Sequence, residues 1–243
     1  MTQAFLKLDN VSKAFGAVKV ADALSYEVTA GEALGVIGPN GAGKTSMFNL
    51  ITGTLTPNQG HVFFDGQNVT SFNAARRSRA GMARSFQVPQ PFSGMTVFEN
   101  AMIAATQAAG LSGQEAEQLC LDVLKQTELL DQANTQAGSL TLLGRKRLEM
   151  TRALCTRPKL LMLDEIAGGL TEGECTALIQ TIKEIHARGV TIIWIEHVVH
   201  ALLAVVDRLI VIDFGKKIAE GEPSAIMESP EVQEIYLGIE ADA

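Results

Sequence analysis

The sequence lacks the features that mark secreted, metal-binding or nucleic-acid-binding proteins. It has three cysteines, an odd number without metal-ligand spacing, so we expect Cys120, Cys155 and Cys175 to be reduced, buried thiols in a cytosolic protein. A formal net charge of −7 argues against broad electrostatic binding to nucleic acid or to an anionic membrane surface. The first residues carry neither the basic start nor the long apolar stretch of a secretory signal, so we expect no export.

Long apolar runs are missing as well. Asp207 and Arg208 separate the apolar stretches 201–206 and 209–212, long before the roughly 20 residues that a membrane-spanning helix needs. If the protein acts at a membrane, other chains must therefore cross it. What is present is an ordinary globular composition, with 47% hydrophobic and 19% charged residues. The 243 residues suffice for one large α/β domain with an insertion, or for two small domains.

A phosphate-binding loop is the most informative motif. Residues 38–45 match G-x-x-x-x-G-K-[ST] at every fixed position, between an apolar run at 33–37 that predicts a buried strand and a predicted helix from 45 to 52. Backbone N–H groups of such a loop point at phosphate oxygens, Lys44 adds a positive charge, and the Thr45 hydroxyl can bind Mg²⁺. The predicted phosphate-binding residues are Gly38, Pro39, Asn40, Gly41, Ala42, Gly43, Lys44, Thr45 and Ser46.

Two further apolar runs end in polar residues that suit nucleotide hydrolysis. The run 160–163 leads into Asp164 and Glu165, which predicts a metal-binding carboxylate acting through water and a second carboxylate that polarises the attacking water. The run 192–195 precedes His197, which can donate a hydrogen bond to the γ-phosphate from the same sheet edge. The amide of Gln87, after the segment 83–86, can ligate Mg²⁺ and connect the γ-phosphate to the following helices.

The alternation of apolar patterns predicts an α/β fold. Residues 5–28 indicate two strands broken at Gly16, residues 62–64 a third, and together they predict an antiparallel layer. Helical spacing runs from 96 to 130, and strands at 160–163 and 190–195 flank a predicted helix at 172–188, which implies a parallel sheet. Closing strands at 209–212 and 217–219 surround a turn at Gly215, and Pro230 precedes a final predicted helix.

The order of these motifs resembles the nucleotide-binding subunits of ABC transporters over essentially the whole chain. By this resemblance Phe15 is the aromatic residue that stacks on adenine, with Val20 packing nearby, and Glu165 and His197 are the catalytic pair. The cofactors implied are ATP and Mg²⁺, the metal being held by Thr45, Gln87 and, through water, Asp164. The stretch GMARSFQ at 81–87, the tripeptide at 219–221 and the ending 234–238 resemble the branch for branched-chain amino acid uptake.

The resemblance implies a P-loop NTPase core of ABC ATPase type with an antiparallel β layer and an inserted helical subdomain. It implies one domain over 1–243, with the core and β layer at approximately 1–87 and 156–243 and the helical subdomain at approximately 88–155. Two such chains, identical or homologous, would close head to tail on two ATP molecules. The pair would drive multi-span permease subunits, and indirectly serve a solute-binding protein, from the cytoplasmic side of the membrane, with no nucleic-acid partner.

The sequence departs from the family pattern at two places. The usual LSGGQ signature aligns with residues 140–144, where Leu142 and Leu143 replace the glycine pair and Thr141 keeps a hydroxyl; a shift by one residue would bring Gly144 into use. Residues 168–171 read Gly-Gly-Leu-Thr where Ser-Ala-Leu-Asp is usual, and Ile166 replaces the usual proline. These changes predict that the chain serves its partner's site poorly while its own phosphate site is complete.

Other functions remain open at this point. A similar subunit could move urea or short amides. A soluble ABC protein of translation or DNA repair would usually carry fused domains, a coiled coil or basic arms. A P-loop kinase or GTPase would need an acceptor lid or a guanine-reading motif, and would not need Gln87 and His197 in this order. A regulatory subunit that binds ATP without turnover fits the altered signature but not the intact Glu165.

The segment after Gln87 is a candidate contact with the membrane subunits. Two prolines and a glycine in residues 88–95 predict an irregular loop. Its apolar residues, Phe92 and Met95, either anchor a partner or fold back into the helical part of the chain. The family resemblance favours a partner contact, because this surface receives the coupling helix of the permease.

Overall fold

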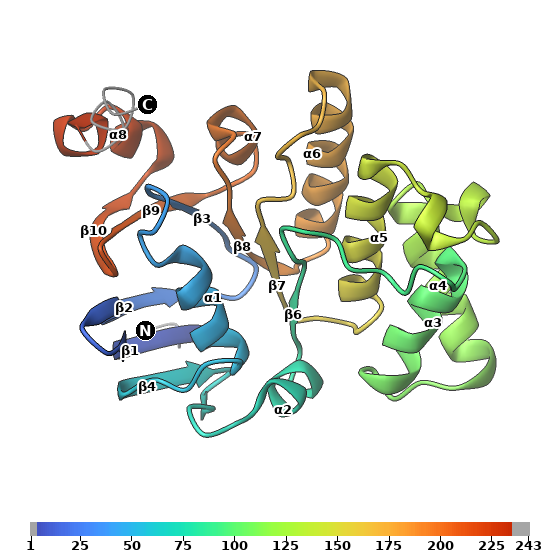
Figure 1. The fold of residues 1–243 in the computed structure, drawn as a ribbon, viewed down its shortest axis with the longest axis horizontal. Coiled ribbons are helices and arrows are strands. Elements are labelled where there is room, and N and C mark those ends of the chain that lie inside the picture. Colours follow the sequence, from blue (N-terminus) through green and yellow to red (C-terminus); the bar gives the residue numbers. More distant parts are fainter. Residues whose placement is uncertain (1–3, 235–243) are drawn as a thin grey trace.

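The computed structural model describes residues 4–234 and contains two β-sheets and a group of helices at one end (Figure 1). The central sheet has six strands in the order β10-β9-β3-β8-β7-β6. The neighbouring pairs β9–β3, β3–β8, β8–β7 and β7–β6 are parallel, and β10 runs antiparallel to β9. Its strands are β3 (Ala33–Ile37), β6 (Met82–Arg84), β7 (Leu160–Asp164), β8 (Thr191–Ile195), β9 (Arg208–Asp213) and β10 (Lys216–Gly221).

Every residue of β3, β7 and β8 is buried, because both faces of this sheet are covered. One face packs with the helices α6 (Glu172–Ala187) and α7 (Val199–Leu203) in one apolar cluster. The other face shares a second cluster with α1 (Lys44–Thr52) and with the antiparallel sheet. The parallel sheet predicted from the apolar runs is therefore confirmed, and the carboxyl ends of β3, β7, β8 and β9 meet at one edge.

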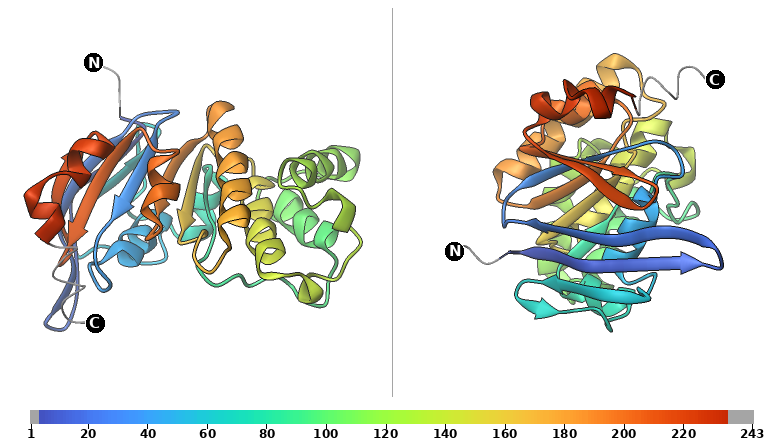
Figure 2. Two further views of the ribbon diagram at one scale, coloured as in Figure 1. Left: turned by 90° about the horizontal axis from the view of Figure 1, so that it is seen from above. Right: turned by 90° about the vertical axis from the view of Figure 1, so that its left-hand side faces the viewer.

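The antiparallel sheet has the order β2-β1-β4-β5. Its strands are β1 (Leu6–Phe15), β2 (Val18–Val28), β4 (Gln59–Phe64) and β5 (Gln67–Asn68). The expected break at Gly16 is the turn between β1 and β2, where Phe15 pairs with Val18. The right-hand view of Figure 2 shows the blue and cyan strands of this layer one above another, in front of the helical end of the molecule.

Helices gather beyond the β6 edge of the central sheet (Figures 1 and 2). They are α3 (Val97–Gln107), α4 (Gly113–Gln126), the short turns η1 (Leu130–Gln132) and η2 (Ala137–Ser139), and α5 (Leu142–Leu154). The stretch 96–130, where helical spacing was predicted, contains α3 and α4. A capping box at Thr96 and Glu99 begins α3, and the same device at Thr171 and Glu174 begins α6.

Three further short helices lie elsewhere in the described chain, before a last helical segment at residues 230–234. They are α2 (Ala74–Arg79), α7 and α8 (Pro223–Met227). Residues 230–234 are helical, so this segment begins at Pro230 itself, a favoured first helical position. The continuation to Gly238, on which part of the family resemblance rested, lies outside the described residues. Within residues 4–234 no helix combines the length and the apolar character needed to cross a bilayer.

Candidate nucleotide-binding and hydrolytic site

The predicted phosphate loop joins the end of β3 to the start of α1. Its glycines are required because neighbouring backbone comes very close. A Cβ atom on Gly38 would lie 2.0 Å from the carbonyl oxygen of Ile212, and one on Gly43 would lie 2.3 Å from that of Val20. Both glycines have positive φ values, which other residues rarely adopt. These close approaches fix the path of the loop into the N-terminus of α1, and a helix N-terminus favours anion binding.

The side chain of Lys44 folds over this loop. Its Nζ atom donates hydrogen bonds to the carbonyl oxygens of Gly38, at 2.6 Å, and Pro39, at 2.9 Å. Only 6% of the residue is exposed. Burial lowers the pKa of Lys44, while the negative charges of Glu165 and Asp164 act in the opposite direction. The ammonium group therefore lies among acceptors that phosphate oxygens could replace.

Asp164 ends β7 beside the loop and is almost fully buried, with 2% of the residue exposed. Its Oδ2 atom accepts a hydrogen bond from Arg84 at 2.5 Å. Its Oδ1 atom has no hydrogen-bond partner among the described residues, so one lone-pair direction remains for a further donor. Burial raises the pKa of Asp164, and the Arg84 guanidinium opposes that shift. A carboxylate with one free buried oxygen fits a metal-bound water.

Glu165 is held by two residues that are distant in the sequence. His197 Nε2 lies 2.9 Å from Glu165 Oε1, and the Gln87 amide donates a hydrogen bond to Glu165 Oε2. The backbone of Glu165 has a φ of 48°, an uncommon value for a residue with a side chain. Such strain is characteristic of functional sites. The structure therefore brings together the three residues that the sequence suggested separately.

A cleft of about 390 Å³ lies over these groups. Its lining consists of Val20, Asn40, Gly41, Ala42, Gly43, Lys44, Thr45, Ser46, Gln87 and Glu165. Phe15 lies outside this lining, at the end of β1, with 52% of the residue exposed. Among the residues expected to touch a nucleotide, Val20 therefore lines the cleft with the loop residues, Gln87 and Glu165, whereas the Phe15 ring is exposed at the β1–β2 turn.

Three residues around the site were missed by the sequence reasoning. Arg84 binds Asp164, Lys146 donates a hydrogen bond to the carbonyl oxygen of Glu165 at 3.3 Å, and Glu196 accepts the backbone N–H groups of Ala167 and His197. Glu196 could have been suspected, because it directly precedes His197 at the end of an apolar run. Arg84 and Lys146 carry no comparable local signal.

The altered signature begins α5 and is not among the residues that line the cleft. Thr141 caps this helix, its hydroxyl accepting a hydrogen bond from the Gly144 N–H at 3.2 Å. Gly144 therefore lies inside the first turn of the helix. Leu142 is 46% exposed.

Comparisons with known proteins agree with this geometry. Residues 21–168 match the family model described as "ABC transporter", and residues 216–242 match "Branched-chain amino acid ATP-binding cassette transporter". The chain is 32% identical to the high-affinity branched-chain amino acid transport ATP-binding protein BraF of Pseudomonas aeruginosa, over 98% of this chain and 99% of the relative. It is 34% identical to LivG of Escherichia coli K12, which carries the same description, over 98% and 99%.

Solved structures give the same result. A nucleotide-free ATP-binding cassette from an ABC transporter superposes with a TM-score of 0.89 at 32% identity, covering 96% of this chain and 99% of that one. The ADP conformation of an ATP-binding cassette of an ABC transporter superposes with a TM-score of 0.88 at 31% identity, covering 98% and 100%. The predicted ABC ATPase fold is confirmed. The chain is an ATP-hydrolysing subunit that belongs to the ABC transporter family, in the branch that includes the branched-chain amino acid transport ATP-binding proteins.

Proposed function

We propose that this chain hydrolyses ATP to drive the import of branched-chain or related amino acids through separate permease subunits. The observation that carries the proposal is the contact of Glu165 with both Gln87 and His197 above the phosphate loop. The cargo is inferred from the relatives' names and from the match over residues 216–242. In this proposal residues of approximately 1–87 and 156–243 form the nucleotide-binding core, and approximately 88–155 form a helical subdomain.

Each residue of the site has a distinct role in this proposal. The loop N–H groups and Lys44 bind the β- and γ-phosphates, and Glu165 orients and polarises the water that attacks the γ-phosphate. His197 Nε2 holds Glu165 in place, and a hydrogen bond from this atom to a γ-phosphate oxygen would replace that contact once ATP is bound. Phe15 and Val20 provide an apolar surface for the adenine base.

The residues present fit a magnesium ion. Mg²⁺ takes oxygen ligands and usually keeps several waters, bound by one or two protein groups and the substrate phosphates. The Thr45 hydroxyl lines the cleft, and the free Oδ1 atom of Asp164 can accept a hydrogen bond from a metal-bound water. The carbonyl oxygen of the Gln87 amide is the third candidate ligand. When bound, the ion would neutralise charge that develops on the phosphates.

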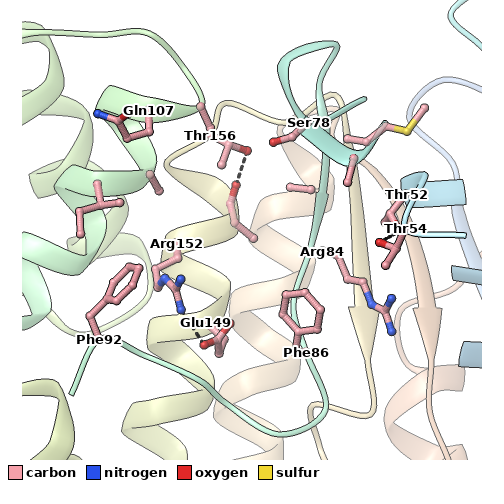
Figure 3. Close-up of a pocket in the computed structure, with 17 residues that line it drawn as sticks. Thr52, Thr54, Ser78, Arg84, Phe86, Phe92, Gln107, Glu149, Arg152 and Thr156 are labelled. Carbon is pink, nitrogen blue, oxygen red and sulfur yellow. Dashed lines mark hydrogen bonds and ion pairs between the residues drawn. The ribbon is translucent and has the colours of Figure 1, made fainter. Parts of the chain in front are cut away.

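A second cleft, of about 380 Å³, is the candidate docking site for a permease helix (Figure 3). It lies between β6, α3 and α5, and its lining includes Phe86, Phe92 and Ile103. Phe86 is 53% exposed and Phe92 is 45% exposed, so both rings are available to an apolar partner. Met95 is only half-buried and is not part of this lining.

The loop after Gln87 is fastened to α5 at this cleft. Glu149 Oε1 accepts the backbone N–H of Gln90 at 2.8 Å and lies 2.9 Å from Arg152. Arg152 also donates to the carbonyl oxygen of Gln90 at 2.8 Å, and its guanidinium lies 5.0 Å from the ring centre of Phe92. Figure 3 shows Glu149 and Arg152 between the two phenylalanine rings. Movement of Gln87 at the γ-phosphate would therefore reach both the docking cleft and α5.

The remaining partners follow from the same proposal. The chain would pair head to tail with a second, homologous ATPase, and the permease would hold the pair at the cytoplasmic side of the membrane. Urea or short amides are the alternative cargo. The match to the ABC transporter family does not favour the other functions considered, namely those of a kinase, a GTPase or a soluble ABC protein.

Deletion of the gene in its host tests the proposal. We expect the deletion strain to lose most uptake of radiolabelled leucine, isoleucine and valine. The wild-type gene should restore uptake, whereas Lys44→Ala, which removes the charge that binds the phosphates, should not. Urea uptake is measured in the same strains. Loss of urea uptake with normal amino acid uptake would reject the proposed cargo and leave the ATPase role standing.

A further inference from the structure

Phe214 is the most exposed large apolar side chain among residues 4–234, with 81% of the residue accessible to solvent. It lies in the two-residue turn between β9 and β10, where Asp213 pairs with Lys216. Both turn residues have positive φ values, 44° for Phe214 and 74° for Gly215. Turns of this kind strongly prefer Asn-Gly, and a bulky residue at the first position is strained. The turn thus carries an unfavourable residue that no burial compensates.

The position of this turn relates it to the phosphate loop. Strand β9 runs parallel to β3, with Ile37 beside Val211, so the turn lies at the sheet edge where the phosphate loop begins. The Gly215 N–H donates a hydrogen bond to the carbonyl oxygen of Ala42 at 2.8 Å. A Cβ atom on Gly43 would lie 3.4 Å from Gly215 Cα. Gly215, the residue that follows Phe214, is therefore hydrogen-bonded directly to the proposed phosphate loop.

The same turn also contacts the strand that leads away from the aromatic Phe15. The Asp22 N–H donates to the carbonyl oxygen of Gly215 at 2.8 Å, and a Cβ atom on Gly215 would lie 3.0 Å from the carbonyl carbon of Val20. Val18, which pairs with Phe15, is two residues from Val20 on β2. Two exposed aromatic residues thus flank the start of β2 beside the phosphate loop: Phe15 at the β1–β2 turn and Phe214 at the β9–β10 turn.

We propose that Phe214 is a second base-contacting residue, which packs against the adenine ring of the nucleotide from the side opposite to Phe15. This inference rests on the proposed binding of ATP at the phosphate loop. A nucleotide whose phosphates occupy the loop must extend its base over the adjacent surface, and a planar ring stacks well on aromatic side chains. Binding of the base would cover the Phe214 ring, which supplies the compensation that the free turn lacks.

Calorimetric titration with ADP and with pyrophosphate tests this role, because only ADP has a base and neither ligand undergoes turnover. The variant Phe214→Asn removes the ring and places the preferred Asn-Gly pair in the turn, so it should fold at least as well as the wild type. We expect its affinity for ADP to fall on the order of tenfold and its affinity for pyrophosphate to stay unchanged. Phe214→Tyr should keep wild-type affinity for ADP.

Leu121→Ala serves as the matched control, because Leu121 is an exposed apolar residue of α4, with 39% of the residue accessible, outside the lining of the nucleotide cleft. Equal ADP affinity in wild type and Phe214→Asn would overturn the inference, as would an equal loss for ADP and pyrophosphate. A loss of ADP affinity seen only at protein concentrations where the chain self-associates would assign Phe214 to an interface instead. Failure of the wild type to bind either ligand would reject the proposed function itself.

Discussion

The side chain of Leu142 lies against Gly169: a Cβ atom added to Gly169 would be 3.4 Å from Leu142 Cδ2. These residues belong to the two segments in which the sequence departs from the family pattern. Gly169 has a φ of 76°, so a side chain there would be strained by its backbone conformation. The two departures from the family pattern are therefore neighbours in the structure, although 27 positions separate Leu142 from Gly169.

Restoring the signature with Leu142→Gly and Leu143→Gly should improve how well this chain completes the ATP site of its partner. The original chain should hydrolyse ATP slowly alone and work best beside a different ATPase with an intact signature. The glycine variant should raise the rate in complexes where this signature faces a partner's ATP. ATPase assays of each pairing measure the effect, with Leu142→Ala/Leu143→Ala as a matched control. Equal rates for the glycine and original chains in every pairing would reject the asymmetry.

Glu165→Gln should separate ATP binding from hydrolysis. The phosphate loop remains intact in this variant, while the carboxylate proposed to polarise the attacking water is lost. We expect normal ATP affinity, a hydrolysis rate lower by roughly 100-fold or more, and accumulation of a closed dimer in size-exclusion chromatography with ATP. Hydrolysis at the wild-type rate would show that Glu165 does not activate the water.

Binding of ATP should take up protons at alkaline pH. Burial lowers the pKa of Lys44 from its usual 10.5. As the pH rises, the Lys44 side chain therefore loses its proton at a lower pH than an exposed lysine does. Bound phosphates favour the charged form, so binding at about pH 9 should draw a proton from the buffer while binding at about pH 7 should not. Titrations in two buffers of different ionisation enthalpy measure this uptake.

Lys44→Arg is the control for that measurement, because a guanidinium stays charged throughout this pH range. The variant should show no rise in proton uptake between the two conditions, provided that it still binds ATP. The same rise in both proteins would mean that another group takes up the proton.

Phe92→Asp should uncouple the subunit from its permease. The ring is exposed in the docking cleft, so its replacement should leave the isolated chain folded and able to bind ATP. A carboxylate there would oppose docking of an apolar helix, and we expect assembly and transport to fall at least tenfold. Co-purification with the permease and uptake assays measure this. Leu121→Asp, at an exposed site on α4 outside this cleft, is the control. Normal uptake with Phe92→Asp would contradict the proposed docking site, and unfolding would favour a core role.

Much of the site could be predicted from short segments of the sequence. The apolar run 33–37 became β3 with the same bounds, and the glycine pattern after it places Lys44 at the start of α1. These features depend on residues that are adjacent in the chain, where spacing and backbone preferences decide the local conformation. The order of motifs was also sufficient to identify the family.

The contacts within the site could not be predicted in this way. Gln87 and Glu165 are separated by 78 positions, and Arg84 and Asp164 by 80. These pairs meet because β6, β7 and β8 lie side by side in an order that the apolar periodicity of each strand does not contain. The sequence alone thus determined which groups are available, from local pattern and motif. The order of the strands, set by packing across the whole core, decided which of them touch.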